Sequence, residues 1–306
     1  MRRFPGEEEQ CNEVREALGG HFKLADRVFD SWLSQPKDEA ISKSTLPTPT
    51  MNLAMALDVQ ATRLFRSVIE QCWRGEGQNG HIVSRTLFET VLTQGFLLAE
   101  RIPIFAARVT RNGAVVPGQF RAKVCLEGDA DQRWLTREQR ADLYLAHMDL
   151  EFNRDIERVA QFPGMEERAL DLQDHIDPSV SRGHEAAVGP EWSYILTNHP
   201  WSYSGLTVSA LAPVVDEALG QWHRTIYGYQ CRPVHANDLV RHLRISDAEM
   251  LGVKYLSTEN EVRECIIAAT TLFLVNIAML QTHVPFGQDE EMIFRSLRLG
   301  FDVLRQ

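Results

Sequence analysis

The amino-acid sequence predicts an all-α protein, a multi-helix bundle that carries one small irregular or β-hairpin insertion. Apolar residues recur three and four positions apart along most of the chain, which is the spacing of helices that bury one face. One segment, at about 105–135, departs from this spacing. The 306 residues are 44% hydrophobic, which is enough to bury a large core. We expect residues 1–50 to form an N-terminal helix and a linker that pack on the bundle, and residues 51–306 to form the bundle domain.

The first part of the chain predicts three helices. From Val14 to Trp32 the apolar residues have helical spacing, although Gly19 and Gly20 lie inside the stretch. Each glycine weakens a helix by about 1 kcal/mol relative to alanine. Two further helices are indicated by the apolar stripes Leu53–Cys72 and Leu87–Ile102.

The insertion contains a preferred hairpin turn. The dipeptide Asn112-Gly113 favours a two-residue β-turn, and Val109 and Val115 flank it. We therefore expect a small β-excursion or an extended loop at this point, inserted into the helical bundle.

The second half of the chain returns to helical spacing. Thr136 is expected to open a long charged helix that ends near Ala160, and residues 163–190 to form short helical pieces. Another helical stretch is predicted from Leu206 to about Tyr229, with Pro213 in its interior or at its true start.

A capping signal precedes the most apolar segment. Thr258 and Glu261 match a capping box, in which each side chain bonds the other residue's backbone N–H. The apolar run Ile266–Leu280 that follows is shorter than the roughly 20 residues of a membrane span, so we read it as a buried core helix. A final helix is expected over about 289–304.

Composition argues against several classes of protein. The five cysteines include no CxxC pair and are odd in number, which disfavours a disulfide framework or a zinc site and fits a reducing compartment. The N-terminal segment turns acidic before any apolar stretch, so a signal peptide is not expected. We expect a cytoplasmic protein with no membrane partner. The net charge of −10 disfavours nucleic acid unless positive charge is concentrated locally.

Common cofactor and metal signatures are missing from the sequence. There is no Walker loop, no GxGxxG, no GxSxG elbow, no HExxH and no Glu-x-x-His pair. We therefore expect no cofactor and no metal.

Three local groups of residues are candidates for a site. In the first, Arg85 and Glu89 are four residues apart and share one helix face. They form either a surface ion pair or the lining of a cleft between helices. In the second, Trp201 lies in an aromatic loop that is either pinned onto the bundle or serves as a lid beside a site.

The third group is a local basic cluster in an acidic chain. Pro233 is expected to end a helix near Arg232, which places His235 just past a helix C-terminus, where a protonated imidazole is favoured. The cluster could meet a phosphate or an acidic ligand, or it could be a structural histidine with paired arginines. The residues expected to contact a ligand are Tyr229, Asn237, Arg241 and Trp201.

Together these segments resemble an uncharacterised bacterial helical family, a domain of unknown function. The segment 84–89 resembles its Arg-x-x-x-Glu helix, and Trp201-Ser202 resembles its Trp-Ser-Gly stretch. The segment 229–236 resembles its Tyr…Ser…His ending, with Cys231 near the expected serine. The resemblance covers roughly residues 55–285.

That family is in turn similar to HEPN helical bundles, which include metal-independent ribonucleases of toxin and antiviral defence systems. Their motif is an arginine followed four to six residues later by a histidine at a helix end, whereas Arg232 and His235 are three apart here. HEPN proteins commonly dimerise. Here Arg232 and His235 are separated by Pro233 and Val234. The resemblance implies a HEPN-like endoribonuclease that binds RNA, with a homodimer or a partner protein.

In this interpretation His235 would be the general acid or base on the ribose 2′-hydroxyl and Arg232 would stabilise the phosphorane. Arg85 would assist, Glu89 would hold Arg85, and Asn237 would orient a phosphate. The alternative is a non-catalytic sensor or binding module for an anionic small ligand or a protein partner. A third interpretation is a structural subunit of a larger assembly.

Overall fold

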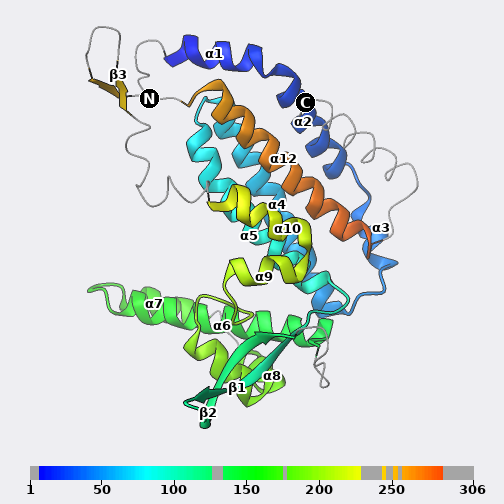
Figure 1. Ribbon diagram of the computed structural model, residues 1–306, viewed down its shortest axis with the longest axis vertical. Coiled ribbons are helices and arrows are strands. Elements are labelled where there is room, and N and C mark those ends of the chain that lie inside the picture. Colours follow the sequence, from blue (N-terminus) through cyan, green and yellow to red (C-terminus); the bar gives the residue numbers. More distant parts are fainter. Residues whose placement is uncertain are drawn as a thin grey trace. The chain divides into compact units, whose positions relative to one another are not determined.

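The computed structural model confirms a mostly helical fold with a two-stranded hairpin, and HEPN-likeness stays a prediction (Figure 1). It describes residues 7–125, 134–174, 178–228, 243–245, 251–253 and 257–284. The chain divides into two compact units. Unit 1 draws on the ranges 1–46, 54–98 and 221–306, and unit 2 draws on 47–53 and 99–220. Unit 2 therefore extends well beyond the predicted insertion at about 105–135, while the predicted boundary near residue 50 stays a prediction.

Unit 1 is built mainly from helices, three of which have more than 20 residues. They are α1 (Glu7–Ala17), α2 (Gly19–Leu33), α3 (Lys37–Ser42), α4 (Thr48–Trp73, from Ala54 onward), α5 (Gly77–Leu98) and α12 (Glu259–Gln281). A short antiparallel pair, β3 (Leu243–Ile245) and β4 (Leu251–Val253), also belongs to this unit, and the sequence pattern does not indicate it. The helix expected over 289–304 lies outside the described residues.

The stretch predicted as one helix from Val14 to Trp32 is two helices. α1 ends at Ala17 and α2 begins at Gly19, so the break falls where the glycines weaken the helix. Leu18, between them, is fully buried. Its N–H donates to the Val14 carbonyl at 2.9 Å and its carbonyl accepts from Phe22 at 3.1 Å, so helical hydrogen bonding continues through the break.

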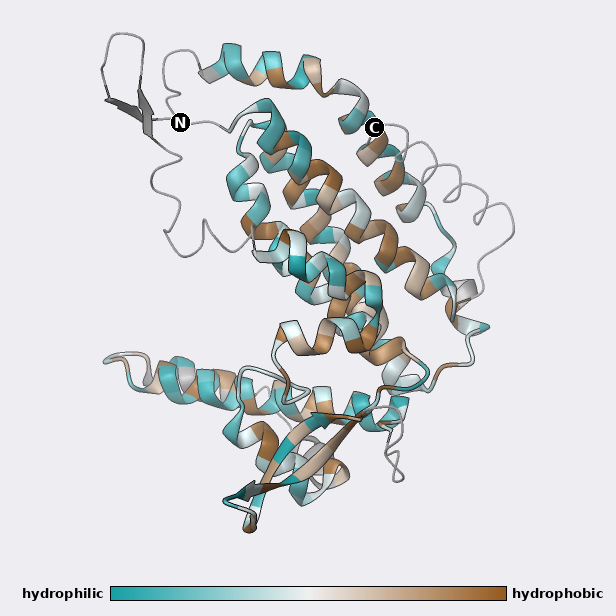
Figure 2. Ribbon diagram, in the orientation of Figure 1, coloured by the Kyte–Doolittle hydropathy of each residue, from teal (hydrophilic) through white to brown (hydrophobic). Residues whose placement is uncertain are grey.

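Helix α12 lies in the core of unit 1, in contact with α5 and α2. Figure 2 shows its apolar residues along much of its length. The rings of Phe65 on α4 and Phe273 on α12 stack with centroids 4.5 Å apart and planes 9° apart. By length and composition alone α12 could cross a membrane, and 56% of its most apolar window is buried within the protein.

The predicted capping box at Thr258 is confirmed, and so is the helix start predicted at Thr136. At the start of α12 the Glu261 N–H donates to Thr258 Oγ1 at 3.3 Å, and the Thr258 N–H donates to Glu261 Oε2 at 2.6 Å. Thr136 and Gln139 form the same capping box at the start of α6 (Arg137–Ala160), at 3.3 Å and 3.0 Å. Both helices begin where the sequence predicts because the orphan N–H groups are bonded there.

Unit 2 contains the hairpin that Asn112-Gly113 predicts. β1 (Ile104–Arg111) pairs antiparallel with β2 (Ala114–Val124), in a register from Ile104–Val124 to Arg111–Ala114. Asn112 and Gly113 both have positive φ, 51° and 81°, as a two-residue turn of this kind requires. A bulge falls between Arg108 and Thr110.

The helices of unit 2 pack on this hairpin and on one another. α8 (Pro178–Asn198) contacts β2 and α6, and α7 (Glu166–Asp174) contacts α6. Gly189 interrupts α8 with a φ of 78°, and Pro190 follows it.

The stretch predicted as one helix over 206–229 is broken into three elements. They are α9 (Val208–Val215, with Pro213 inside), α10 (Glu217–Trp222) and the π-helical turn η1 (His223–Tyr227). The last of these, η1, belongs to unit 1.

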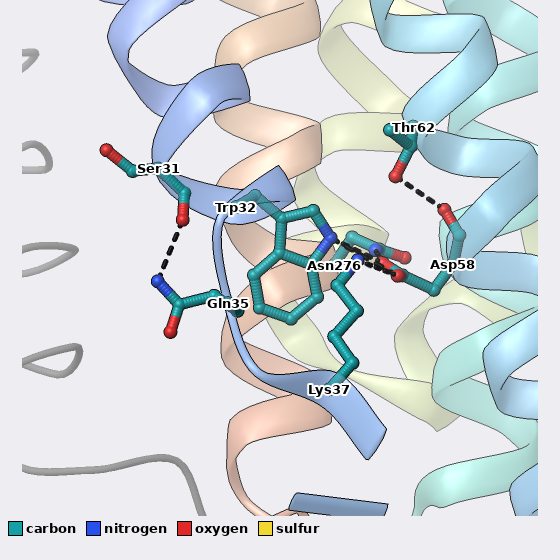
Figure 3. A network of polar contacts seen from close by, with 7 residues as sticks. All are labelled: Ser31, Trp32, Gln35, Lys37, Asp58, Thr62 and Asn276. Atoms are coloured by element: carbon teal, nitrogen blue, oxygen red, sulfur yellow. Dashed lines mark hydrogen bonds and ion pairs between the residues drawn. The ribbon is translucent and has the colours of Figure 1, made fainter. Parts of the chain in front are cut away.

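A buried carboxylate joins four helices of unit 1. The side chain of Asp58 on α4 has no exposed surface. It accepts hydrogen bonds from Trp32 Nε1 of α2 at 3.1 Å, from Lys37 Nζ of α3 at 3.0 Å and from Asn276 Nδ2 of α12 at 2.9 Å (Figure 3). The Lys37 ammonium also lies 4.2 Å from the centroid of the Trp32 ring.

Burial raises the pKa of Asp58, and the charge of Lys37 opposes that rise. A buried charge is tolerated only when it is paired and hydrogen-bonded. The Asp58 cluster (Asp58, Trp32, Lys37 and Asn276) therefore fixes how α2, α3 and α12 meet α4.

We predict that Asp58→Ala lowers the free energy of unfolding by about 3–5 kcal/mol, because it removes the acceptor shared by the partly buried Lys37 ammonium, the Trp32 indole N–H and the Asn276 amide. Asp58→Asn keeps one acceptor oxygen and should cost less than Asp58→Ala. Urea unfolding followed by circular dichroism measures both variants.

The matched control is Asp155→Ala, which removes one partner of an exposed ion pair with Arg158 on α6. This change should cost at most about 1 kcal/mol. Equal costs for Asp58→Ala and Asp155→Ala would contradict the role assigned to Asp58.

Candidate functional site

The predicted pair on α5 shares one helix face, as the spacing requires. Arg85 Nε donates to Glu89 Oε1 at 3.2 Å. The two side chains are 28% and 40% exposed, so the pair lies at the edge of the core and is open to solvent.

Tyr227 of η1, which lies 138 residues after Glu89 in the sequence, hydrogen-bonds to both members of this ion pair. Its hydroxyl donates to Glu89 Oε1 at 2.5 Å and accepts from Arg85 Nε at 3.1 Å. Burial and the Glu89 carboxylate raise the pKa of Tyr227, so the phenol stays protonated at neutral pH and keeps donating.

Two more rings enclose the same phenol. The His223 ring stacks on Tyr227 at 4.8 Å between centroids, and the Phe88 ring lies 5.1 Å from it. Burial, and then the charge of Arg224, lower the pKa of His223, so its imidazole is neutral at pH 7. The Tyr227 cluster (Arg85, Phe88, Glu89, His223 and Tyr227) thus gathers a guanidinium, a phenol donor and a neutral imidazole, groups that can hold an anion or move a proton.

The other predicted site residues fall elsewhere. Residues 229–242 lie outside the described residues, so the roles of Tyr229, Arg232, His235, Asn237 and Arg241 stay predictions. Trp201 lies in unit 2, where it is 67% exposed and meets the His199 ring edge-on at 5.1 Å.

The loop that carries Trp201 is anchored by buried serines. Ser202 and Ser204 are buried, and Ser202 Oγ donates to the Leu206 carbonyl at 2.6 Å. Anchoring of this kind favours the interpretation of a pinned loop, from which the indole of Trp201 projects.

Positive charge is concentrated on the hairpin of unit 2, and the prediction of candidate residues missed it. No acidic residue occurs between Arg101 and Cys125. The basic hairpin (β1 and β2) carries four exposed cations: Arg108, Arg111, Arg121 and Lys123. Within the described ranges none of the four takes part in an ion pair. The sequence signal was this run of 26 residues without an acid, between Glu100 and Glu127.

A pocket of about 510 Å³ lies beside this hairpin, within unit 2. Its size suits a small ligand or a short peptide segment. It combines aromatic walls with one charge of each sign, from Arg108 and Glu191. This hairpin pocket is lined by Ile104, Phe105, Ala106, Arg108, Phe120, Trp134, Leu135, Gln139, Glu191 and Trp192.

The segment that carries Trp134 is held by a buried arginine. Arg140 on α6 is fully buried and donates to the backbone carbonyls of Leu135 and Ala99. Burial lowers the pKa of Arg140 to about 10, which still leaves it charged at neutral pH. One guanidinium therefore ties the pocket wall at Leu135 to the chain that leads into β1.

No protein-family model, no curated protein and no solved structure matches the chain. Among the described residues, no group of three or more His, Cys, Asp and Glu side chains could hold a metal ion.

We predict that Tyr227→Phe lowers the free energy of unfolding by about 1–2 kcal/mol, because the hydroxyl bridges a carboxylate and a guanidinium at a partly exposed position. Thermal or urea unfolding measures the loss. Tyr194→Phe is the control, since the Tyr194 ring packs on Phe120 but its hydroxyl makes no hydrogen bond within the described residues. Equal free energies of unfolding for the two variants would show that the hydrogen bonds of the Tyr227 hydroxyl do not stabilise the fold.

Proposed function

We propose that the chain is a non-catalytic binding module for an anionic ligand or partner, and that the basic hairpin and the hairpin pocket form its binding surface. The observation that carries this proposal is the set of four exposed cations on β1 and β2 without an acidic partner among the described residues. Concentrated charge of one sign attracts a partner of the other sign.

The hairpin differs in this respect from the helices. Several helix arginines pair with an acid three or four residues away: Arg66, Arg85, Arg154, Arg158 and Arg263. The chain has 42 acidic and 32 basic residues, so acids are plentiful. The hairpin cations have no acidic partner among the residues that the structure describes, which supports a role in binding a ligand. Arg85, in contrast, already donates its Nε–H to Glu89 and Tyr227.

The pocket adds contacts that charge alone does not supply. Phe120, Trp134 and Trp192 offer aromatic surface beside Arg108. Aromatic side chains bind apolar or planar groups, while a guanidinium binds carboxylate or phosphate in a fixed geometry. The combination fits an anion that also carries a planar or apolar part.

We predict that anions raise the melting temperature of the protein at low salt, by roughly 2–4 °C for each kcal/mol of binding free energy. The panel is inorganic phosphate, a nucleoside triphosphate, heparin and an aspartate-rich peptide, measured by differential scanning fluorimetry. The double variant Arg108→Gln/Arg121→Gln should lose the shift.

The control Arg66→Gln/Arg158→Gln makes the same charge change on helices and should keep the shift. High salt should suppress the shift in the wild-type protein, because the contacts are exposed and electrostatic. An unchanged melting temperature across the whole panel would rule out the proposed surface.

A second candidate function, the HEPN-like ribonuclease, is favoured by the Tyr227 cluster. An imidazole and a guanidinium both contact one phenol there: the His223 ring centroid is 4.8 Å from that of Tyr227, and Arg85 Cζ is 5.4 Å from it. These are the groups that metal-independent RNA cleavage uses for proton transfer and charge stabilisation.

If the chain is a nuclease, we predict that purified protein cleaves RNA in the presence of EDTA and that His235→Ala lowers the rate by roughly 10²–10⁴-fold. Arg85→Ala should lower it as well, and Arg66→Ala, on an exposed ion pair, is the control. Denaturing gels of a labelled RNA give the rate. Cleavage that persists in His235→Ala would end the role of that histidine, and no cleavage by wild-type protein would favour the binding module.

A further inference from the structure

Two buried thiols meet in the core of unit 1. Cys72, near the end of α4, and Cys265 on α12 are free cysteines, and neither has exposed surface. A Cβ added at Gly80 on α5 would lie 2.7 Å from Cys265 Sγ and 3.3 Å from Cys72 Sγ, so glycine alone fits at this position. Both sulfurs therefore pack against the same point of α5, which makes them neighbours of each other.

Backbone contacts hold the helices around the two thiols close together. The Ser257 N–H, just before α12, donates to the Gly75 carbonyl, just before α5, at 2.9 Å. A Cβ added at Gly77 on α5 would lie 3.1 Å from the backbone nitrogen of Val262 on α12. Cys265 follows Val262 by about one helical turn. The place where the sulfurs meet is therefore set by the packing of α5 on α12 and not by side-chain rotation alone.

The folded chain protects this pair from oxidation. A hydrogen bond with Cys265, and then burial, raise the pKa of Cys72, so its thiol stays protonated at neutral pH. The thiolate is the form that oxidants attack, and a thiol in apolar surroundings is inert. Oxidation of the pair therefore requires unit 1 to open locally and admit water and an oxidant.

We propose that Cys72 and Cys265 form a redox-sensitive pair, which hydrogen peroxide oxidises to a disulfide between α4 and α12 when unit 1 opens. One thiol loses its proton and its sulfur attacks a peroxide oxygen, so the O–O bond breaks and a sulfenic acid forms. The second sulfur then attacks the sulfenic sulfur, the S–O bond breaks and the S–S bond forms. The two sulfurs give up two electrons, and the products are the disulfide and two molecules of water.

A disulfide at this point would act on more than two side chains. The S–S bond is about 2.05 Å long, so the two sulfurs must come closer than unbonded sulfurs can, beside Gly80. The bond joins helices from distant parts of the sequence, and such a cross-link stabilises by restricting the unfolded chain. It also lies against α5, the helix that carries the ion pair of Arg85 and Glu89. The stability of unit 1 then depends on exposure to oxidant.

Two other described cysteines are placed differently. Cys11 Sγ donates to the Arg74 carbonyl at 3.0 Å, and Cys125 lies in unit 2. Both are buried as well, so burial alone does not distinguish the pair. The distinction is the shared contact with Gly80, and Cys125 is therefore a matched control.

The test treats the full chain with hydrogen peroxide, with and without urea below the unfolding midpoint. Remaining thiols are blocked with N-ethylmaleimide, and peptide mapping by mass spectrometry without reduction locates the bond. We expect one linked peptide, which joins Cys72 to Cys265 with the loss of two hydrogens. Its rate of formation should rise on the order of tenfold per molar urea, because opening limits the reaction.

Variants and a stability measurement accompany the mapping. Cys125→Ala should form the linked peptide like wild type, whereas Cys265→Ala should not form it. Because Cys265→Ala also removes a buried side chain, the mapping of the wild-type protein decides the question. The oxidised wild-type protein should unfold at a higher urea concentration than the reduced protein, and dithiothreitol should reverse the shift.

Several results overturn the proposal. Sulfinic or sulfonic acid at Cys72 or Cys265 without a linked peptide is one, and linkage spread equally among the five cysteines is another. A disulfide that lowers the urea midpoint is a third, since the bond would then be incompatible with the folded helices. A rate that urea does not change contradicts the requirement for opening. Binding of the anion panel has no part in these outcomes, so this inference and the proposed function fail separately.

Discussion

Unit 1 depends on keeping one buried carboxylate satisfied. Asp58 has donors from α2, α3 and α12, and losing any of them leaves a charge or a polar group in a dry interior, which costs several kcal/mol. The positions of these helices are therefore coupled. Because α5 packs on α12, the face of α5 that carries Arg85 and Glu89 is set by the same coupling. The Asp58 cluster thus supports the Tyr227 cluster without touching it.

The charged groups of the two candidate surfaces, the Tyr227 cluster and the basic hairpin, differ in whether they have partners within the described residues. In the Tyr227 cluster each charge has an internal partner: Glu89 accepts from both Arg85 and Tyr227. On the basic hairpin the four cations have no ionic partner in the described part of the chain. A charge that already has an internal partner gains less from a bound anion than one whose partner must come from a ligand. This contrast is the physical basis for ranking the binding module above the nuclease.

Local signals in the sequence predicted local structure well. Thr258 and Glu261, Thr136, and Asn112-Gly113 all act within a few residues, and the structure has a cap or a turn at each. The sequence did not predict which side chains from distant parts of the chain would contact one another. Nothing near Tyr227 signals that its hydroxyl will meet Glu89, because α5 and η1 are brought together only by folding. The size of unit 2 escaped prediction for the same reason, since helical spacing does not say which helices pack on a hairpin.

The kink in α8 influences the shape of the hairpin pocket. Gly189 has a φ of 78°, which residues with a side chain rarely adopt, and the pocket wall Glu191-Trp192 begins two positions later. The position of that pocket wall therefore depends on a backbone conformation that glycine adopts without the strain that other residues incur. The shape of this pocket and the course of α8 are therefore coupled through Gly189, a residue that is not itself part of the pocket lining.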